Sequence, residues 1–472
     1  MLGGGPIGCE LSQCFARLGS AVSQVEMLPQ VKEAFDAYAQ AGFIAGRYDY
    51  ELGGMQLPES VMAACNGFFT AANPGTAGYP FLTTAAANLI RVFGNEQQKT
   101  TFLPNMLSGR FSGTMALTEP HAGSSLADIR TSASPTDEGH YLIEGAKIYI
   151  SGGEQSITDN IVHMVLAKIK GAPAGVKGIS LFIVPKFLVD DEGNPTERNG
   201  VSLAGLIHKL GYRGTTSTAL SFGDDAPCHG YLVGEPHQGL KYMFQMMNEA
   251  RVGVGFGAAV IGYRGYMHSL EYAKDRLQGR KASEKNPESP QVPIIDHADV
   301  RRMLLAQKAY SEGGLALCLY GARLMDDQHT HPDEQKRQEA GKLLDLLTPV
   351  IKAWPSEYGP KANDLAIQEL KKSIEQDPQD ATAHFYLGRV FQQKEQYEES
   401  LIYFQTVLSL DPDLEQIALF QIGLAYSKIE EKEDAKLALG MALEKDPESA
   451  TAAEIENLLN ELGVKTGKSK KN

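Results

Sequence analysis

The alternation of apolar and polar residues changes along the chain and separates helical stretches from a strand-like one. From about Lys32 to Arg110, apolar residues recur at helical spacing in short stretches that end at Gly or Pro. Between Phe111 and Glu235 the pattern is strand-like, and turns rich in Gly, Pro and Asp separate the apolar runs. Long helical patterns return from about Gly239. This order predicts an α+β protein with a central β domain between two helical parts.

A different, periodic pattern follows near Gly359. Asp-Pro pairs fall at 377–378, 411–412 and 446–447, which is the period of a tetratricopeptide repeat, a helix–turn–helix unit. A half-repeat with Ala366 and Leu370 precedes them, its first helix is missing, and we expect an abrupt join close to residues 357 to 362. The residues expected to pack the paired helices are Leu387, Gly388, Ser400 and Phe404, then Ile422, Gly423, Tyr426, Ala435, Leu439 and Ala442.

The first 31 residues carry a glycine-rich loop. Gly3, Gly5 and Gly8 open an amphipathic stretch, and a strand-like run follows that ends at Glu26. This segment resembles the nicotinamide-binding unit of flavin disulfide reductases. Only two residues precede the glycines and no second strand–helix–strand unit follows, so we expect a truncated Rossmann-like unit that does not bind NAD.

Composition excludes several classes of protein. The 472 residues carry a net charge of −14, which argues against a nucleic-acid binder, and the Lys-rich end is expected to be a solvated tail. The five cysteines form no C-x-x-C pair, so we expect neither a disulfide framework nor a metal site. No apolar run is long enough for a membrane span, and a cytoplasmic protein is the expectation.

Five motifs in the central part occur in an order that is typical of one enzyme family. They are MALTEPHAGSSLADIRTSA from position 115, GAKIYISGGEQ from 145, KLGYRGTTSTALSF from 209, NEARVGVGFGAAVIG from 248 and AKDRLQGR from 273. Over residues 32 to 357 the chain resembles the acyl-CoA dehydrogenases, in particular the bacterial branch with methylthiopropionyl-CoA and long-chain enzymes. The resemblance implies the cofactor FAD, an acyl-CoA substrate, α,β-dehydrogenation in fatty acid metabolism, an electron-transfer partner that the sequence does not identify, and a possible homo-oligomer.

The same resemblance assigns residues to the cofactor and to the substrate. The positions that match flavin contacts are Met115, Leu117, Thr118, Gly123, Ser124, Tyr149, Ile150, Ser151, Arg276, Gln278 and His297, and the last three would act partly across a subunit boundary. Ser124 would also meet the acyl-CoA, and Asn248 and Arg251 match positions that contact CoA.

No residue of the sequence matches the family's catalytic base. In this branch the base is a glutamate in a Tyr-Glu-Gly-Thr motif after a Gly-Gly-containing flavin loop, and neither occurs here. Other branches place the base just before the position of Arg251, which here is Ala250. Glu249 is rotated by about 100° around the helix from that position, and Glu119 belongs to the flavin-contacting turn. We therefore assign no catalytic residue and expect an impaired or inactive dehydrogenase that binds FAD weakly.

These interpretations divide the chain into six segments. They are a truncated Rossmann-like unit (1–31), an N-terminal helical part (32–110), a central β-barrel domain (111–235), a truncated helical bundle (236–357), an α-solenoid of tetratricopeptide repeats (358–464) and a basic tail (465–472). Two alternatives stay open. The chain is a composite of joined fragments with a catalytically dead core, or it works through its repeats as a protein-interaction module with a peptide partner.

Overall fold

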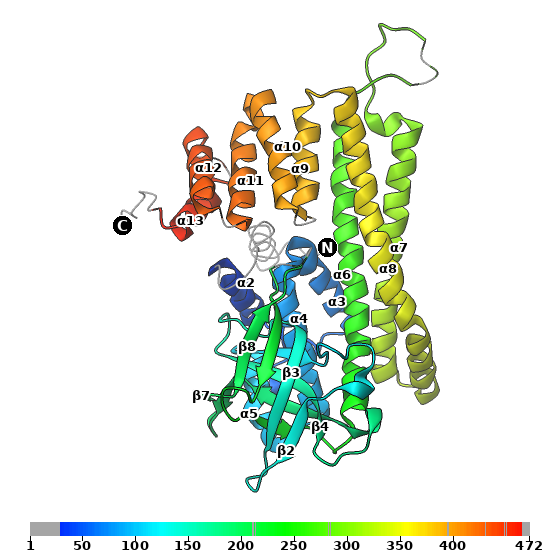
Figure 1. The fold of residues 1–472 in the computed structure, drawn as a ribbon. Coiled ribbons are helices and arrows are strands. Elements are labelled where there is room, and N and C mark those ends of the chain that lie inside the picture. Colours follow the sequence, from blue (N-terminus) through cyan, green and yellow to red (C-terminus); the bar gives the residue numbers. More distant parts are fainter. Residues whose placement is uncertain are drawn as a thin grey trace.

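The computed structural model describes residues 29 to 464, apart from positions 210, 211, 213, 282, 284, 394, 395, 430, 448 and 450. Residues 1 to 28 of the expected glycine-loop unit (1–31) and the tail from residue 465 lie outside the described residues. Figure 1 shows a mixed helix-and-sheet part at one end of a long helical bundle, and a stack of shorter helices beside the bundle's other end. Among the described residues no helix is both long and apolar enough to cross a membrane. Their three cysteines, Cys65, Cys228 and Cys318, are free thiols.

Within the described residues, four α-helices precede the first strand. They are α2 (Pro29–Gln40), α3 (Glu59–Ala72), α4 (Pro74–Phe93) and α5 (Glu96–Leu107). The side chain of Asn73 accepts a hydrogen bond from the Thr76 amide and caps α4, and a capping box starts α5. The boundary expected between residues 31 and 32 falls inside α2. This helix extends back to Pro29 because Val31 belongs to the core that it packs against.

The central part is a β-barrel. Its strands are β1 (Phe111–Ala116), β2 (Ser132–Pro135), β3 (Tyr141–Ser151), β4 (Asn160–Ile169), β5 (Ile179–Pro185), β6 (Phe187–Val189), β7 (Pro195–Arg198), β8 (Val201–Leu206), β9 (Ser217–Phe222) and β10 (His229–Leu232). The main sheet follows the order β1-β4-β5-β10-β3-β9-β8, while β2 pairs with both β3 and β4 and so closes a ring of strands. The expectation of a central barrel is confirmed.

Three long helices form the bundle: α6 (Gly239–Asp275), α7 (Ala298–Thr330) and α8 (Glu334–Gln376). The expected join at residues 357 to 362 lies inside α8, which continues without a break through Pro349, Pro355 and Pro360. A single helix belongs to both the bundle and the repeats (Figure 1), so the expected change of sequence pattern does not coincide with a break in secondary structure.

Close packing on α6 explains why α8 tolerates its prolines. A proline inside a helix costs about 3 kcal/mol or more, so another interaction must offset it. A Cβ atom at Gly255 would lie 2.1 Å from the Ile351 carbonyl oxygen, and one at Gly262 would lie 3.0 Å from the Gly359 carbonyl oxygen. The two helix backbones therefore touch at glycines, and Ile351 is fully buried between them.

The repeats comprise α9 (Ala381–Gln393), α10 (Tyr397–Leu410), α11 (Glu415–Lys428), α12 (Lys432–Lys445) and α13 (Ala452–Glu461). The predicted packing register is confirmed. A Cβ at Gly388 would lie 2.8 Å from the Phe404 ring, and a Cβ at Gly423 would lie 2.5 Å from the Leu439 side chain. Ser400, Phe404, Ala435, Leu439 and Ala442 are fully buried.

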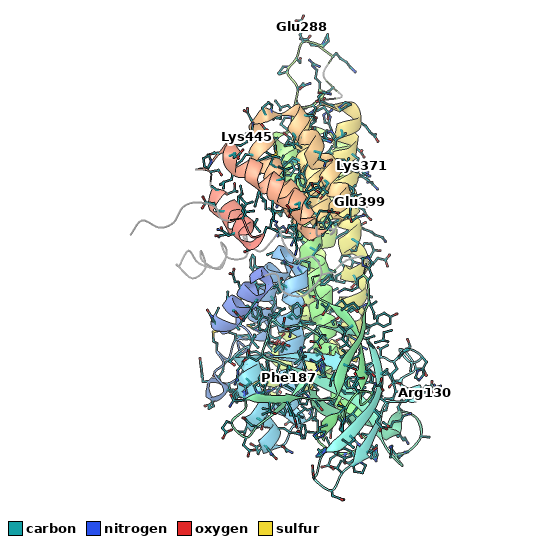
Figure 2. All side chains as sticks on the ribbon, turned by 60° about the vertical axis from the view of Figure 1, so that its left-hand side comes forward. Arg130, Phe187, Glu288, Lys371, Glu399 and Lys445 are labelled. Carbon is teal, nitrogen blue, oxygen red and sulfur yellow. The ribbon has the colours of Figure 1, made fainter. Side chains whose placement is uncertain are left out.

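The repeats and the bundle share one apolar core. Tyr272 of α6 and Leu304 of α7 belong to the same buried cluster as Leu370 of α8 and Leu387 of α9. In Figure 2 the ends of the repeat helices, marked by Glu399 and Lys445, lie well away from the sheet part with Phe187. The loop with Glu288 between α6 and α7 stands free of the rest (Figure 2). The repeat array is thus attached to the bundle through packed side chains as well as through the chain.

Candidate functional site

The turn that follows β1 is tied directly to β3. The amide of Ile148 donates a hydrogen bond of 2.9 Å to the Thr118 carbonyl, and the Lys147 ammonium donates one of 3.0 Å to the Leu117 carbonyl. The structure therefore brings together the two segments that the sequence analysis assigned to the flavin, positions 115–124 and 149–151.

A β-bulge exposes the aromatic ring at the centre of this region. The pairing of β3 with β9 shifts register between Lys147 and Ile150, and Tyr149 inside the bulge has a φ of 62°. A left-handed backbone at a bulky residue is strained, and such strain gathers at functional sites. As a result the Tyr149 side chain is 63% exposed, whereas Ile150 is buried. Ser151 closes the strand and is half-buried.

A buried ion pair holds the turn in place. The Lys147 ammonium lies 2.8 Å from Glu119 Oε1, and both side chains are almost completely buried. Glu119 also accepts hydrogen bonds from the Arg130 amide and from the amide and hydroxyl of Thr131. Burial acts to raise the pKa of Glu119, but the Lys147 charge and these hydrogen bonds outweigh it and lower that pKa. Burial lowers the pKa of Lys147 to about 8, against the opposing effect of Glu119.

The far side of the turn is open. Gly123 and Ser124 are exposed, and Thr118 and Met115 are half-buried. The Thr118 methyl lies against Gly123, where a Cβ would be 3.6 Å away. An exposed aromatic ring beside a hydroxyl and the backbone of a rigid turn fits the planar, hydrogen-bonding ring system of a flavin.

The predicted substrate contacts on α6 form a second group. Arg251 Nη1 donates a hydrogen bond of 2.9 Å to Asn248 Oδ1. Glu249, the carboxylate considered as a base, accepts a hydrogen bond of 2.8 Å from Arg47 Nη2 and one of 3.1 Å from Asn88 Nδ2. Burial acts to lower the pKa of Arg47, but Glu249 and Glu59 outweigh it and raise that pKa. Glu249 is thus engaged as the partner of a guanidinium.

The third group lies at the other end of α6. His297 Nε2 and the Gln278 carbonyl oxygen are 2.7 Å apart, so these two predicted flavin contacts touch. Arg276 Nη2 lies 2.6 Å from Asp377 Oδ2, and its Nε lies 3.1 Å from Asp380 Oδ2. Nη2 donates a hydrogen bond to Asp377, whereas Nε faces Asp380 at ion-pair distance without forming a hydrogen bond. Because two carboxylates flank its guanidinium, Arg276 does not fit a diphosphate in this arrangement.

Helix α6 separates this third group from the turn at positions 115–124, here called the flavin turn after its predicted ligand. Two contacts locate the predicted flavin residues along α6. The Tyr212 hydroxyl lies against α6 at Gly257. A few residues after Tyr212, the Thr216 carbonyl accepts a hydrogen bond from the amide of Gly152, next to Ser151. Arg276 lies about 28 Å from Gly257 along the helix, at the α-helical rise per residue. One chain does not bring Arg276 to its own flavin turn.

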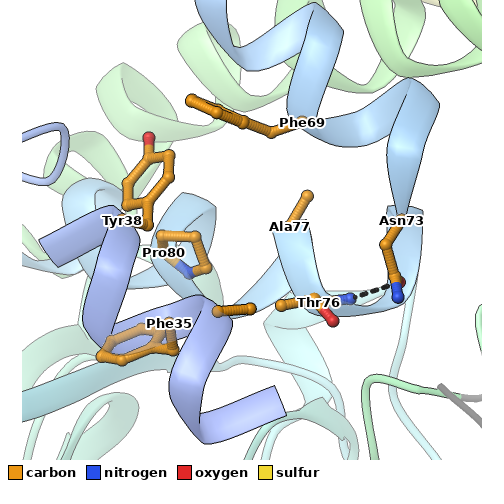
Figure 3. A pocket seen from close by; sticks show the side chains of 8 residues that line it. Phe35, Tyr38, Phe69, Asn73, Thr76, Ala77 and Pro80 are labelled. Carbon is orange, nitrogen blue, oxygen red and sulfur yellow. Dashed lines mark hydrogen bonds between the residues drawn. The ribbon is translucent and has the colours of Figure 1, made fainter. Parts of the chain in front are cut away.

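An apolar hollow lies between α2, α3 and α4. Its eight lining residues are Ala34, Phe35, Tyr38, Phe69, Asn73, Thr76, Ala77 and Pro80, and Figure 3 shows the hydrogen bond from the Thr76 amide to Asn73 at its edge. None of the predicted site residues lines this hollow, so it is separate from the flavin turn.

Sequence reasoning missed the residues that support the site. It did not single out Lys147, although a lysine at an inward position of a strand is an unusual signal. It also did not connect Arg47 to Glu249, or Asp377 and Asp380 to Arg276. These partners lie 28 to 202 positions apart in sequence, beyond the reach of local patterns.

Comparisons with known proteins identify the parts of the chain. Family profiles match the acyl-CoA dehydrogenase N-terminal domain at residues 19–110, the acyl-CoA dehydrogenase middle domain at 114–224, and tetratricopeptide repeats at 381–414 and 417–449. A 3-methylmercaptopropionyl-CoA dehydrogenase of Ruegeria pomeroyi is 40% identical over 72% of this chain and 57% of its own length. A broad-specificity linear acyl-CoA dehydrogenase of Mycobacterium tuberculosis is 39% identical over 70% of this chain and 55% of its own length. The chain thus spans somewhat more than half the length of these curated relatives.

Solved structures show the same fold at lower identity. Butyryl-CoA dehydrogenase from Megasphaera elsdenii has a TM-score of 0.62 and 19% identity, and the match covers 86% of this chain and 97% of that one. An acyl-CoA dehydrogenase from Bacillus anthracis in complex with FAD has a TM-score of 0.60 and 18% identity, with 97% and 84% of the two chains covered.

Proposed function

Because the chain carries the N-terminal and middle domains of the acyl-CoA dehydrogenase family, followed by tetratricopeptide repeats, we propose that it is an acyl-CoA dehydrogenase-like flavoprotein with impaired activity. FAD is the cofactor of this family. The substrate is an acyl-CoA thioester, as the printed names of the relatives suggest. The observation that carries the proposal is the link between the Thr118 turn and the Tyr149 bulge.

The β-barrel supplies the binding surface for the flavin ring. The Tyr149 ring is exposed beside Thr118 because the bulge and the Ile148–Thr118 hydrogen bond fix both segments. The Glu119–Lys147 pair keeps the turn from moving. A rigid turn orients a bound ring without further loss of conformational entropy. Ser124, exposed at the end of this turn, would face the thioester.

Dehydrogenation removes a proton from the α-carbon of the thioester and a hydride from its β-carbon, and the flavin is the hydride acceptor. The proton requires a positioned base, which typically contributes about 10² to 10⁴-fold in rate. Ala250 has no acid group, and Glu249 is held by Arg47 and Asn88. Glu119 is committed to Lys147 and to backbone amides. We therefore propose that this chain binds and orients the substrate but lacks an efficient base to remove the α-proton.

The test is acyl-CoA-dependent reduction of an artificial electron acceptor by the whole chain loaded with FAD. We expect little turnover in the wild type and no further decrease in Glu249→Gln. Robust turnover that is lost in Glu249→Gln would show that Glu249 has become the base and would refute the impairment. Robust turnover that survives this substitution would also refute it and would point to a base elsewhere.

A protein-interaction module is the second candidate function. It is favoured by the well-packed repeat helices and by Leu437 and Met441, two exposed apolar residues one turn apart on α12. If the folded chain binds neither flavin nor acyl-CoA, the interaction module becomes the better description. Absorbance of bound flavin after gel filtration separates the two candidates.

A further inference from the structure

Two aspartates in the first turn of the repeat array form ion pairs with an arginine at the end of the bundle. Arg276 follows the last residue of α6, and its Nη2 and Nε atoms lie 2.6 Å from Asp377 and 3.1 Å from Asp380. The Tyr272 hydroxyl, one helical turn earlier, donates a hydrogen bond to Asp380. The Asp380 side chain is 1% exposed, whereas that of Asp377 is 41% exposed. The guanidinium charge is thus balanced from within the chain.

Each aspartate uses one oxygen for its own turn and the other for Arg276. Asp377 Oδ1 accepts from the Gln379 amide at 3.2 Å, and Asp380 Oδ1 accepts from the Ala383 amide at 3.0 Å and so caps α9. The hydrogen bond from Arg276 is the first cause that lowers the pKa of Asp377. Burial acts to lower the pKa of Arg276, but the hydrogen bond to Asp377 and the charge of Asp380 raise it. Arg276 and Asp377 are therefore charged near neutral pH.

The next repeat shows that the contact is not part of the repeat pattern itself. Asp411 occupies the corresponding Asp-Pro position and accepts from the Asp413 amide at 2.9 Å, as Asp377 does from Gln379. Among the described residues, no cation pairs with the Asp411 carboxylate. The turn at Asp377 has the same local structure and, in addition, binds the bundle.

The turn can open at Asp377 without detaching the repeats. The shared core of Tyr272, Leu370 and Leu387 holds α9 on the bundle by apolar burial, so the ion pair is not the only attachment. A guanidinium has a fixed fork of five N–H donors. A diphosphate would need Nη2, which donates to Asp377, and the position beside Nε, where the Asp380 carboxylate lies. A diphosphate placed beside both aspartates would also meet two like charges.

We propose that the Asp377–Asp380 turn and the diphosphate of a flavin dinucleotide compete for Arg276, so that the repeat array opposes flavin binding at this end of the bundle. This inference rests on the proposed function, which makes FAD the ligand. The apparent affinity for FAD then equals the intrinsic affinity multiplied by the fraction of molecules in which Arg276 is free. The repeats act as an internal competitor.

The test is a titration of the whole chain with FAD and with riboflavin, which lacks the diphosphate. The variants are Asp377→Asn, Asp377→Asn with Asp380→Asn, and Asp411→Asn as the matched control. Asparagine keeps the side-chain oxygen that each turn needs and removes the charge. We expect the affinity for FAD to rise by about tenfold in the double variant, since more molecules have a free arginine, while riboflavin binding and the control stay unchanged. In an Arg276→Gln background the aspartate substitutions should have no effect.

Two results would overturn the proposal, and they can be told apart from failure of the proposed function. If neither aspartate variant binds FAD more tightly than the wild type, the turn does not compete. If riboflavin affinity rises equally, the effect does not involve the diphosphate. Should the double variant unfold, the single Asp377→Asn variant decides, because that carboxylate is partly exposed. If no variant, nor the wild type, binds either flavin, then the proposed function itself falls.

Discussion

A buried lysine and a buried glutamate determine the local geometry of the flavin turn. Lys147 and Glu119 lie 2.8 Å apart on neighbouring segments, and each also bonds to the turn or the strand beside it. Burying charges is costly unless they are paired, so this pair is stable only when both members are present. The conformation of this turn therefore depends on an ion pair within the protein.

Glu119→Gln should destabilise the fold. Glutamine keeps the size and one acceptor oxygen, but it leaves the Lys147 ammonium buried without a carboxylate, which costs about 3–5 kcal/mol. The measurement is chemical unfolding, and Glu119→Gln combined with Lys147→Met should recover part of the loss. Glu96→Gln removes an exposed ion pair with Lys99 and serves as a control with little effect. If Glu119→Gln lowers the free energy of unfolding no more than Glu96→Gln does, then the Glu119–Lys147 pair does not hold the turn.

The buried His163 should make the free energy of unfolding decrease as the pH falls. Burial, aided by the charges of Lys186 and Arg198, lowers the pKa of this histidine to about 3 in the folded chain. Below the unfolded value of about 6.5, the unfolded chain binds a proton that the folded chain does not. The stability is thus fully present above pH 6.5 and decreases as the pH falls toward 3.

From pH 6.5 to 5 this histidine should remove about 2 kcal/mol from the unfolding free energy. The measurement is urea unfolding at both pH values for the wild type and for His163→Gln. The variant lacks the titrating imidazole and should lose less stability over this interval. An identical loss in both proteins would mean that His163 becomes protonated without unfolding the chain.

Sequence reasoning at the residue scale selected the turn that we propose to hold the flavin, but not the residues that support this turn. Thr118 and Tyr149 were identified because whole motifs resemble a family, and motifs are local in sequence. The Glu119–Lys147 pair and the Arg47–Glu249 pair depend on the fold, since their members come from different elements. The left-handed backbone of Tyr149 has no sequence signal at all, because the residue is not a glycine.

At the scale of elements, periodicity gave the right register for the repeats, but it did not show that α8 runs on through residues 357 to 362. The positions of Gly388 and Gly423 follow from the spacing alone, because helix pairs of this kind approach closely only where side chains are small. The change of pattern near Gly359 and the missing first helix of the half-repeat suggested a join, yet one helix continues through it. Close contact with α6 overrides the local preference there, and tertiary contacts of this kind are not visible in one sequence.

Gly423→Leu should separate the α11–α12 pair. Its first side-chain atom would lie 2.5 Å from the Leu439 side chain and 3.2 Å from the Leu439 amide nitrogen, so the helices must move apart. Overpacking of this kind costs about 1–3 kcal/mol, and the melting temperature should fall.

The matched control is Gly440→Ala on α12. No atom lies within 4 Å of a Cβ at this position, so the substitution meets open space. Alanine in a helix is favoured over glycine by roughly 0.5–1 kcal/mol, and the melting temperature should rise slightly. An equal change of melting temperature in the two variants would contradict the predicted packing register of α11 and α12.

At the scale of the whole molecule, the bundle and the repeats should unfold together where their core is shared. Leu387 of α9 is fully buried in the cluster that includes Tyr272 of α6. Trp354, the single tryptophan of the sequence, lies on α8 within the bundle, where its ring stacks on Tyr358 with the centroids 4.8 Å apart. Its fluorescence therefore reports on the bundle, and a substitution in the repeats changes that signal only through the shared core.

Leu387→Ala should shift the denaturant midpoint of the Trp354 signal, because a buried Leu-to-Ala change costs about 2–5 kcal/mol and the cavity lies in the common core. Leu459→Ala removes an equally large side chain from the buried cluster of α11 to α13, which contains no bundle residue. Stability in repeat arrays is transmitted mainly between neighbours, so this control should move the Trp354 midpoint much less. If Leu387→Ala lowers the helix signal by circular dichroism at low denaturant and leaves the Trp354 midpoint unchanged, then the repeats unfold independently. The chain would then behave as joined fragments, and the shared core would not act as one cooperative unit.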